Sequence, residues 1–159
     1  MRRAAMLVAA AAVLLGSNLA AQAPNLTGTW TMVVDPNAPP PQGRGGGGGF
    51  GMTFAAVQDA KTLTITRTTQ NGEVKSVYNL DGSDSKNMAQ GRGGATEQIS
   101  HAKWDGPKLV ITRTQNMGGT DITITQSLWI DASGNLMVST SRPGQDGTPV
   151  TTTVTYKKG

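Results

Sequence analysis

The sequence contains no cysteine in its 159 residues. Disulfide bonds therefore cannot stabilise the fold, and sites that need a thiolate, whether catalytic or metal-binding, are excluded. An acylated lipoprotein is excluded as well, because its lipid is carried by an N-terminal cysteine. A chain of this length can still bury enough apolar surface to fold as one domain without cross-links.

Groups that commonly perform catalysis are also scarce. The chain has one histidine and ten carboxylates, and we place His101 on the solvent face of its predicted strand. Five of the carboxylates lie in predicted turns, where aspartate normally bonds the local backbone: Asp59, Asp81, Asp105, Asp131 and Asp146. No acid, base and nucleophile set emerges, so we expect no enzyme, no metal site and no cofactor.

Aromatic residues make up only 4% of the chain. Barrels that cross a membrane carry two aromatic girdles and strands of about 9–11 residues with an apolar outer face. Here most predicted strands are shorter, and their second face is built from threonine, lysine, glutamine and serine. We therefore expect no membrane span and a water-soluble protein whose apolar face points inward.

A helical period is absent except near the N-terminus, where Arg2 and Arg3 precede an apolar run from Ala4 to Leu15. Small residues follow, which is typical of a secretory signal peptide, and the apolar run is too short to span a membrane. We assign residues 1–21 to this signal, with cleavage after Ala23 as the alternative, and residues 22–159 to a single domain. The expected location is periplasmic or secreted.

The mature chain is only mildly basic. Removing two of the 14 Lys and Arg residues leaves 12 against 10 acidic residues, a net charge of +2. This charge implies no acidic partner, and we expect no nucleic acid to bind.

One short pattern occurs almost unchanged twice, at residues 63–68 (LTITRT) and 109–114 (LVITRT), and more loosely at 136–142 (LMVSTSR). Apolar and polar residues alternate strictly, which indicates a β-strand with one buried face. A second alternating run follows each copy after a turn signal. The repeated unit is therefore a β-hairpin.

Alternation and turn residues predict ten strands, at 25–34, 52–58, 62–69, 73–80, 83–90, 96–104, 108–115, 120–130, 135–142 and 149–157. The weakest is 83–90, which has Met88 as its one apolar anchor. Residues 35–51 are rich in proline and glycine and are expected to form a flexible loop. Successive hairpins without a long crossover predict an all-β protein, an antiparallel up-and-down β-barrel of 8–10 strands.

Gly28-Thr29-Trp30, at the start of the first predicted strand, resembles the Gly-x-Trp motif of lipocalins and related calycin barrels. The resemblance implies that Trp30 plugs the closed base and that a basic residue near the end of the last strand packs on it. Lys157 or Lys158 could do so, and we assign Lys157. The chain is also similar to small exported bacterial β-proteins of unknown function.

The strand parity that puts the apolar side chains inward predicts this core: Trp30, Phe54, Leu63, Ile65, Tyr78, Leu80, Trp104, Leu109, Ile111, Leu128, Ile130, Leu136, Val138, Val154 and Tyr156. Arg67, Arg113 and Arg142 share this inward parity. They emerge at one end of the barrel only if residues 83–90 form a strand, because strand direction alternates.

Guanidinium groups around an apolar cavity would suit the carboxylate of an amphipathic ligand. We therefore expect a monomer that binds a small apolar or amphipathic molecule through Arg67, Arg113 and Arg142, with Tyr78 and Trp104. The alternative is that the arginines reach into solvent and the barrel is filled by its own side chains. It would then act as a protein-interaction or cell-envelope structural module without a ligand.

Overall fold

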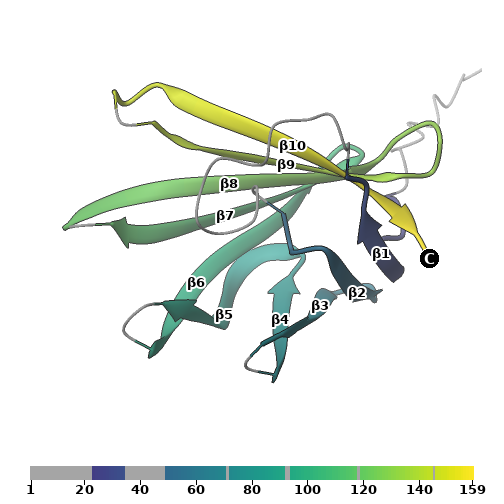
Figure 1. The fold of residues 1–159 in the computed structure, drawn as a ribbon, viewed down its shortest axis with the longest axis horizontal. Helices are drawn as coiled ribbons and strands as arrows, with labels where there is room; N and C mark the ends of the chain where they lie inside the picture. Colours follow the sequence, from purple (N-terminus) through teal and green to yellow (C-terminus); the bar gives the residue numbers. More distant parts are fainter. Residues whose placement is uncertain (1–22, 35–48, 71, 92–93, 118, 145) are drawn as a thin grey trace, which may run out of the picture.

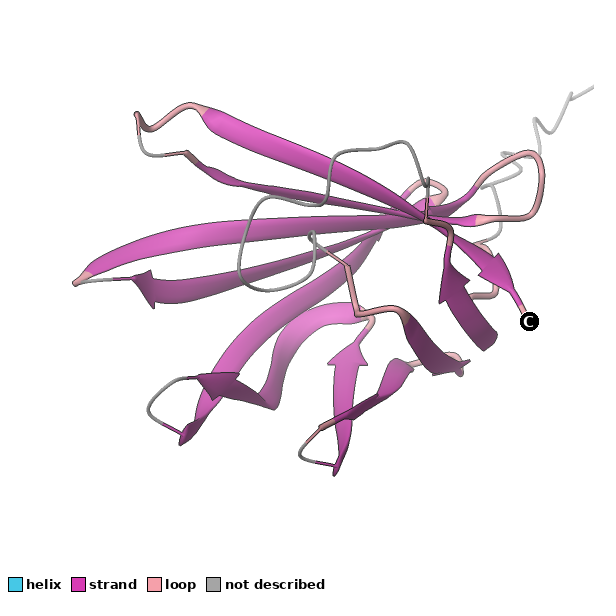
Figure 2. Ribbon diagram, viewed as in Figure 1, coloured by secondary structure: helices cyan, strands magenta, loops and turns pink. Residues whose placement is uncertain are grey.

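The structure is a computed structural model that describes residues 23–34, 49–70, 72–91, 94–117, 119–144 and 146–159. The predicted signal peptide, residues 1–21, and most of the predicted loop, residues 35–51, lie outside these ranges. The described residues contain strands, turns and loops and no helix (Figure 2).

Ten β-strands follow one another along the chain. They are β1 (Gly28–Met32), β2 (Thr53–Gln58), β3 (Thr62–Thr69), β4 (Gly72–Asn79), β5 (Asp81–Gly91), β6 (Gly94–Asp105), β7 (Lys108–Met117), β8 (Thr120–Ile130), β9 (Leu136–Pro143) and β10 (Pro149–Lys158).

All the strands belong to one antiparallel sheet, in the order β4-β3-β2-β1-β10-β9-β8-β7-β6-β5. Each strand in this order lies beside its neighbour in sequence, and β1 pairs with β10 to join the two ends of the chain. This is an up-and-down barrel that is nearly closed, so the predicted fold class is confirmed. The hairpins β3–β4, β5–β6, β7–β8 and β9–β10 fan out at one end, which we call the mouth (Figure 1). The opposite end is the base.

The barrel is joined between β4 and β5 by side chains. The Asn87 amide accepts a hydrogen bond from the Val77 N–H (2.7 Å) and donates one to the Val77 carbonyl (2.9 Å). The Ser85 hydroxyl accepts a bond from the Asn79 N–H at 2.8 Å. These side chains replace the backbone ladder that is absent from this seam among the described residues.

The fifth strand exists and is longer than predicted, because it spans Asp81–Gly91. Strands β3, β7 and β9 consequently run in the same direction. The predicted turn at Asp81 and Gly82 was wrong, since both residues belong to β5. Gly82 has φ of +86° and lies in a register shift between Asp81 and Asp84, so the glycine serves a β-bulge.

The core gathers toward the base. All the predicted core residues are buried except Leu80, Trp104, Ile130 and Val154, which are partly buried and pack against the cluster. Five buried apolar residues were not predicted: Leu26, Phe50, Ala56, Ala102 and Ile124. Phe54 packs on both Phe50 and Tyr156, with ring centroids 5.2 and 5.0 Å apart.

The Tyr156 hydroxyl holds the chain at Phe50 and Gly51, just before β2. The hydroxyl accepts a hydrogen bond from the Phe50 N–H at 3.0 Å and donates one to the Gly51 carbonyl at 2.9 Å. Burial raises the pKa of Tyr156, while the bond from Phe50 opposes the rise. One buried tyrosine thus anchors the segment that leads into β2.

Candidate functional site

The interior changes from apolar to polar from the base toward the mouth. Trp104, Leu109, Leu128 and Val138 are cross-strand neighbours in one apolar row. The next row toward the mouth lies two residues away in each strand, and it contains the buried Gln126 and Thr140. The row beyond contains the buried Ser100, paired with Arg113, which is in turn paired with Ile124.

Arg113 is the most unusual side chain of the polar half. Its Nη1 donates a hydrogen bond to the Gln126 Oε1 at 3.0 Å. Its Nε is buried and has no hydrogen-bond partner among the described residues. Burial lowers the pKa of Arg113, the neighbouring Tyr78 hydroxyl opposes this, and the charge of Arg67 lowers it further.

Tyr78 and Arg67 share this region of the barrel with Arg113. Tyr78 is buried, and burial raises its pKa, whereas Arg113, the Ser76 hydroxyl and Arg67 act in the opposite direction. Arg67 is half-buried at the mouth end of β3. The structure therefore brings together three of the predicted ligand-binding residues, from strands β3, β4 and β7.

The other two predicted ligand-binding residues lie elsewhere. Arg142 has the expected inward parity and lies toward the mouth, but it is exposed near the end of β9. Trp104 lies in the base row beside Leu109 and packs against the core. Its partner Leu109 lies four residues before Arg113 in β7, which corresponds to about 13 Å along the strand.

At the base, Trp30 is buried and its Nε1 donates to the Leu26 carbonyl at 2.9 Å. Lys158, and not Lys157, lies over its ring, with Nζ 5.7 Å from the centroid. Trp30 pairs with Lys158 in register, and Lys157 pairs with Thr31 and has the opposite parity. The assignment of Lys157 was therefore wrong by one residue.

Gly28 makes this contact possible. A Cβ at Gly28 would lie 2.5 Å from the Lys158 Cε, so a larger residue would displace the lysine.

Strands β6 and β7 separate toward the mouth. Their ladder runs from Asp105↔Lys108 to Ser100↔Arg113 and ends there. Residues 94–99 continue in β6, paired with β5, and residues 114–117 continue in β7, paired with β8. We call the opening between these two segments the β6–β7 split, and Figure 1 shows the two strands diverging.

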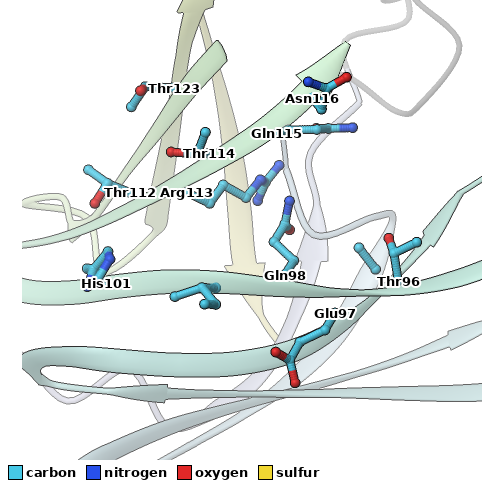
Figure 3. Close-up of a pocket in the computed structure, with 12 residues that line it drawn as sticks. Thr96, Glu97, Gln98, His101, Thr112, Arg113, Thr114, Gln115, Asn116 and Thr123 are labelled. Atoms are coloured by element: carbon cyan, nitrogen blue, oxygen red, sulfur yellow. The ribbon is translucent and has the colours of Figure 1, made fainter. Parts of the chain in front are cut away.

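The β6–β7 split holds a cavity of about 790 Å³. Figure 3 shows Gln98 of β6 and both Arg113 and Gln115 of β7 extending into the space between the strands. Sequence reasoning did not identify the two glutamines. Their inward parity was visible, but a polar residue on the inner face gives no hydrophobic signal.

Residues on the outer face of the split make exposed contacts. The His101 Nδ1 lies 3.5 Å from the Asp84 Oδ1, and the Lys86 Nζ lies 3.7 Å from the Glu97 Oε1. His101 is exposed, as predicted. Within the described ranges, no three His, Asp or Glu side chains are grouped so that they could hold a metal ion.

No family model matches the chain, and no curated protein matches it. The described part of the chain contains no helix that is long and apolar enough to cross a membrane.

Proposed function

We propose that this protein is an exported, lipocalin-like barrel that binds a small amphipathic molecule by its acidic group. The observation that carries the proposal is the buried Nε of Arg113, which lacks a partner among the described residues and lines a cavity of about 790 Å³. A buried donor without an acceptor costs free energy, so an acceptor from a ligand would remove that cost.

The chemistry of Arg113 favours a carboxylate as that acceptor. A guanidinium presents donors in a planar fork that matches the two oxygens of a carboxylate. Arg67 adds a second positive charge close enough to affect the Arg113 pKa. An anion would offset the repulsion between these two cations. Ala89 and Ile99 line the same cavity and would offer apolar contact to the rest of the ligand.

Export and lipocalin resemblance rest on separate observations. The signal peptide predicted at residues 1–21 supports export. Gly28, Trp30 and Lys158 form a base contact of the kind that the Gly-x-Trp motif implies. Neither observation bears on the identity of the ligand.

The experiment compares decanoate with decanol by isothermal titration calorimetry at neutral pH. We expect decanoate to bind and decanol to bind at least about tenfold more weakly, because only the carboxylate carries a negative charge and two acceptor oxygens that match the Arg113 guanidinium. Arg113→Met is expected to remove this preference. Arg142→Met is the matched control, since Arg142 has the same parity but is exposed, and it should bind decanoate as the wild type does.

Urea unfolding establishes that Arg113→Met still folds. The variant should stay folded with little change in stability, because losing the hydrogen bond to Gln126 is offset by removing a charged group with a buried, unpaired donor. Equal binding of decanoate and decanol by the wild type would contradict the proposal.

The second candidate is a protein-interaction or cell-envelope structural module. The observation that favours it is a pair of exposed valines on the outer wall, Val57 and Val77, which flank the half-buried Thr64 in register. This candidate gains if neither decanoate nor decanol binds.

A further inference from the structure

The β6–β7 split has a shape that restricts what can enter it. The two strands meet at Ser100↔Arg113 and diverge toward the mouth, so the opening is a wedge with a closed apex. A chain that passed through would need an exit at the apex, where the ladder from Ser100↔Arg113 to Asp105↔Lys108 blocks it. A chain that enters from the mouth therefore ends at the apex, beside Arg113.

The walls of the split are strand edges. Residues 94–99 have β5 on one side, and residues 114–117 have β8 on one side, so each segment has one edge without a strand partner among the described residues. Unpaired N–H and C=O groups on such an edge are a template for an added strand. Gln98 and Gln115, which extend between the walls, offer amides that also pair well with peptide groups.

We propose that the ligand of this cavity is the free carboxyl end of an extended peptide, inserted with its terminal carboxylate at Arg113. The proposal rests on the proposed function, because the same guanidinium receives the acidic group, and it adds the class of molecule that carries the group. The positive charge at the apex selects a C-terminal carboxylate and repels an N-terminal ammonium group.

The direction of the peptide follows from this choice. Strand β7 runs toward the mouth, so a peptide that enters from the mouth with its carboxyl end leading is antiparallel to β7 and parallel to β6. Antiparallel pairing is the more stable of the two. The four residues 114–117 of β7 span about 14 Å. They therefore accommodate about four residues of an incoming strand.

The test uses an N-acetylated tetrapeptide of alternating threonine and valine, with either a free carboxylate or a C-terminal amide. Two-dimensional NMR of the full mature chain reports both affinity and location. We expect the free acid to bind at least about tenfold more tightly than the amide. Its shifts should concentrate at the backbone amides of residues 94–99 and 114–117.

Two variants control the experiment. Arg113→Met should bind acid and amide equally, and Arg142→Met should keep the preference for the acid. Equal affinity of the wild type for acid and amide, or shifts outside the split, would overturn the proposal. If decanoate binds and neither peptide does, the peptide inference fails while the proposed function stands. If nothing binds, both fail.

Discussion

At the scale of single residues, short-range hydrogen bonds organise the turns of this barrel. The Asp59 carboxylate accepts bonds from the N–H groups of Lys61 and Thr62, each at 2.7 Å. Asp131 accepts bonds from the Ser133 and Asn135 N–H groups in the same way. The prediction that turn aspartates bond the local backbone is confirmed for Asp59, Asp131 and Asp146, and Asp81 makes the same kind of bond to the Ser83 N–H within β5.

These bonds predict an acid limit of stability. The pKa values of the four aspartates are lowered from 3.8, chiefly by bonds from neighbouring N–H and side-chain groups. A carboxylate whose pKa is lower in the folded state contributes stability that is fully present above its unfolded pKa. That contribution is lost as the pH falls through the folded values. Urea midpoints measured between about pH 6 and about pH 2 should therefore stay level and then decline below 3.8.

Asp59→Asn provides the matched control, because an amide oxygen still accepts hydrogen bonds but does not titrate in this range. The variant should show a shallower decline than the wild type. Carboxyl carbon NMR would measure each pKa directly. Values at or above 3.8 for these four groups would contradict the expectation.

At the scale of the strands, alternation predicted the structure closely. The predicted ranges 62–69 and 120–130 coincide with β3 and β8. The error at Asp81 and Gly82 arose because a glycine with positive φ serves a hairpin turn and a β-bulge equally well. The choice between them depends on the register with β6, and that register is a tertiary property.

The candidate site was predictable only in part. Parity placed Arg67 and Arg113 inward, but parity also placed Arg142 there, and the structure leaves Arg142 exposed. Whether an inward arginine becomes buried depends on where the neighbouring ladders end. The β6–β7 split could not be predicted for the same reason, since nothing in the sequence of either strand marks Ser100 and Arg113 as the last pair of the ladder.

The seam between β4 and β5 carries the prediction at this scale. Asn87→Ala removes both hydrogen bonds to Val77 and leaves the Val77 N–H and C=O without these partners. We expect a loss of about 1–3 kcal/mol in the free energy of unfolding. The Val77 amide hydrogen should also exchange faster in NMR hydrogen-exchange measurements.

Asn25→Ala is the control for this seam. Asn25 is exposed and accepts a bond from the Thr27 N–H two residues away, so its loss should leave the exchange of Val77 unchanged. Equal stability of Asn87→Ala and the wild type would show that the seam does not depend on the Asn87 amide.

At the scale of the whole molecule, the barrel wall is interrupted at the seam between β4 and β5, and the hairpin of β5 and β6 borders this seam. The hairpin of β5 and β6 is well paired internally, with partners from Asp84↔His101 to Gly91↔Gly94. Its β4 side is held by side-chain bonds, and its β7 side is held by a ladder that ends at Ser100↔Arg113. By contrast, β8, β9 and β10 each have a strand partner on both sides.

This asymmetry predicts that the β5–β6 hairpin opens as a unit before strands β8, β9 and β10. Local opening free energies are lowest where few contacts hold a segment. Hydrogen exchange followed by mass spectrometry should therefore show residues 81–105 exchanging together, and faster than residues 120–158. Asn87→Ala should widen the difference, since it weakens one of the two attachments. Uniform exchange across both segments would mean that the wall unfolds as one cooperative unit, and that the β6–β7 split is a fixed opening of a rigid barrel.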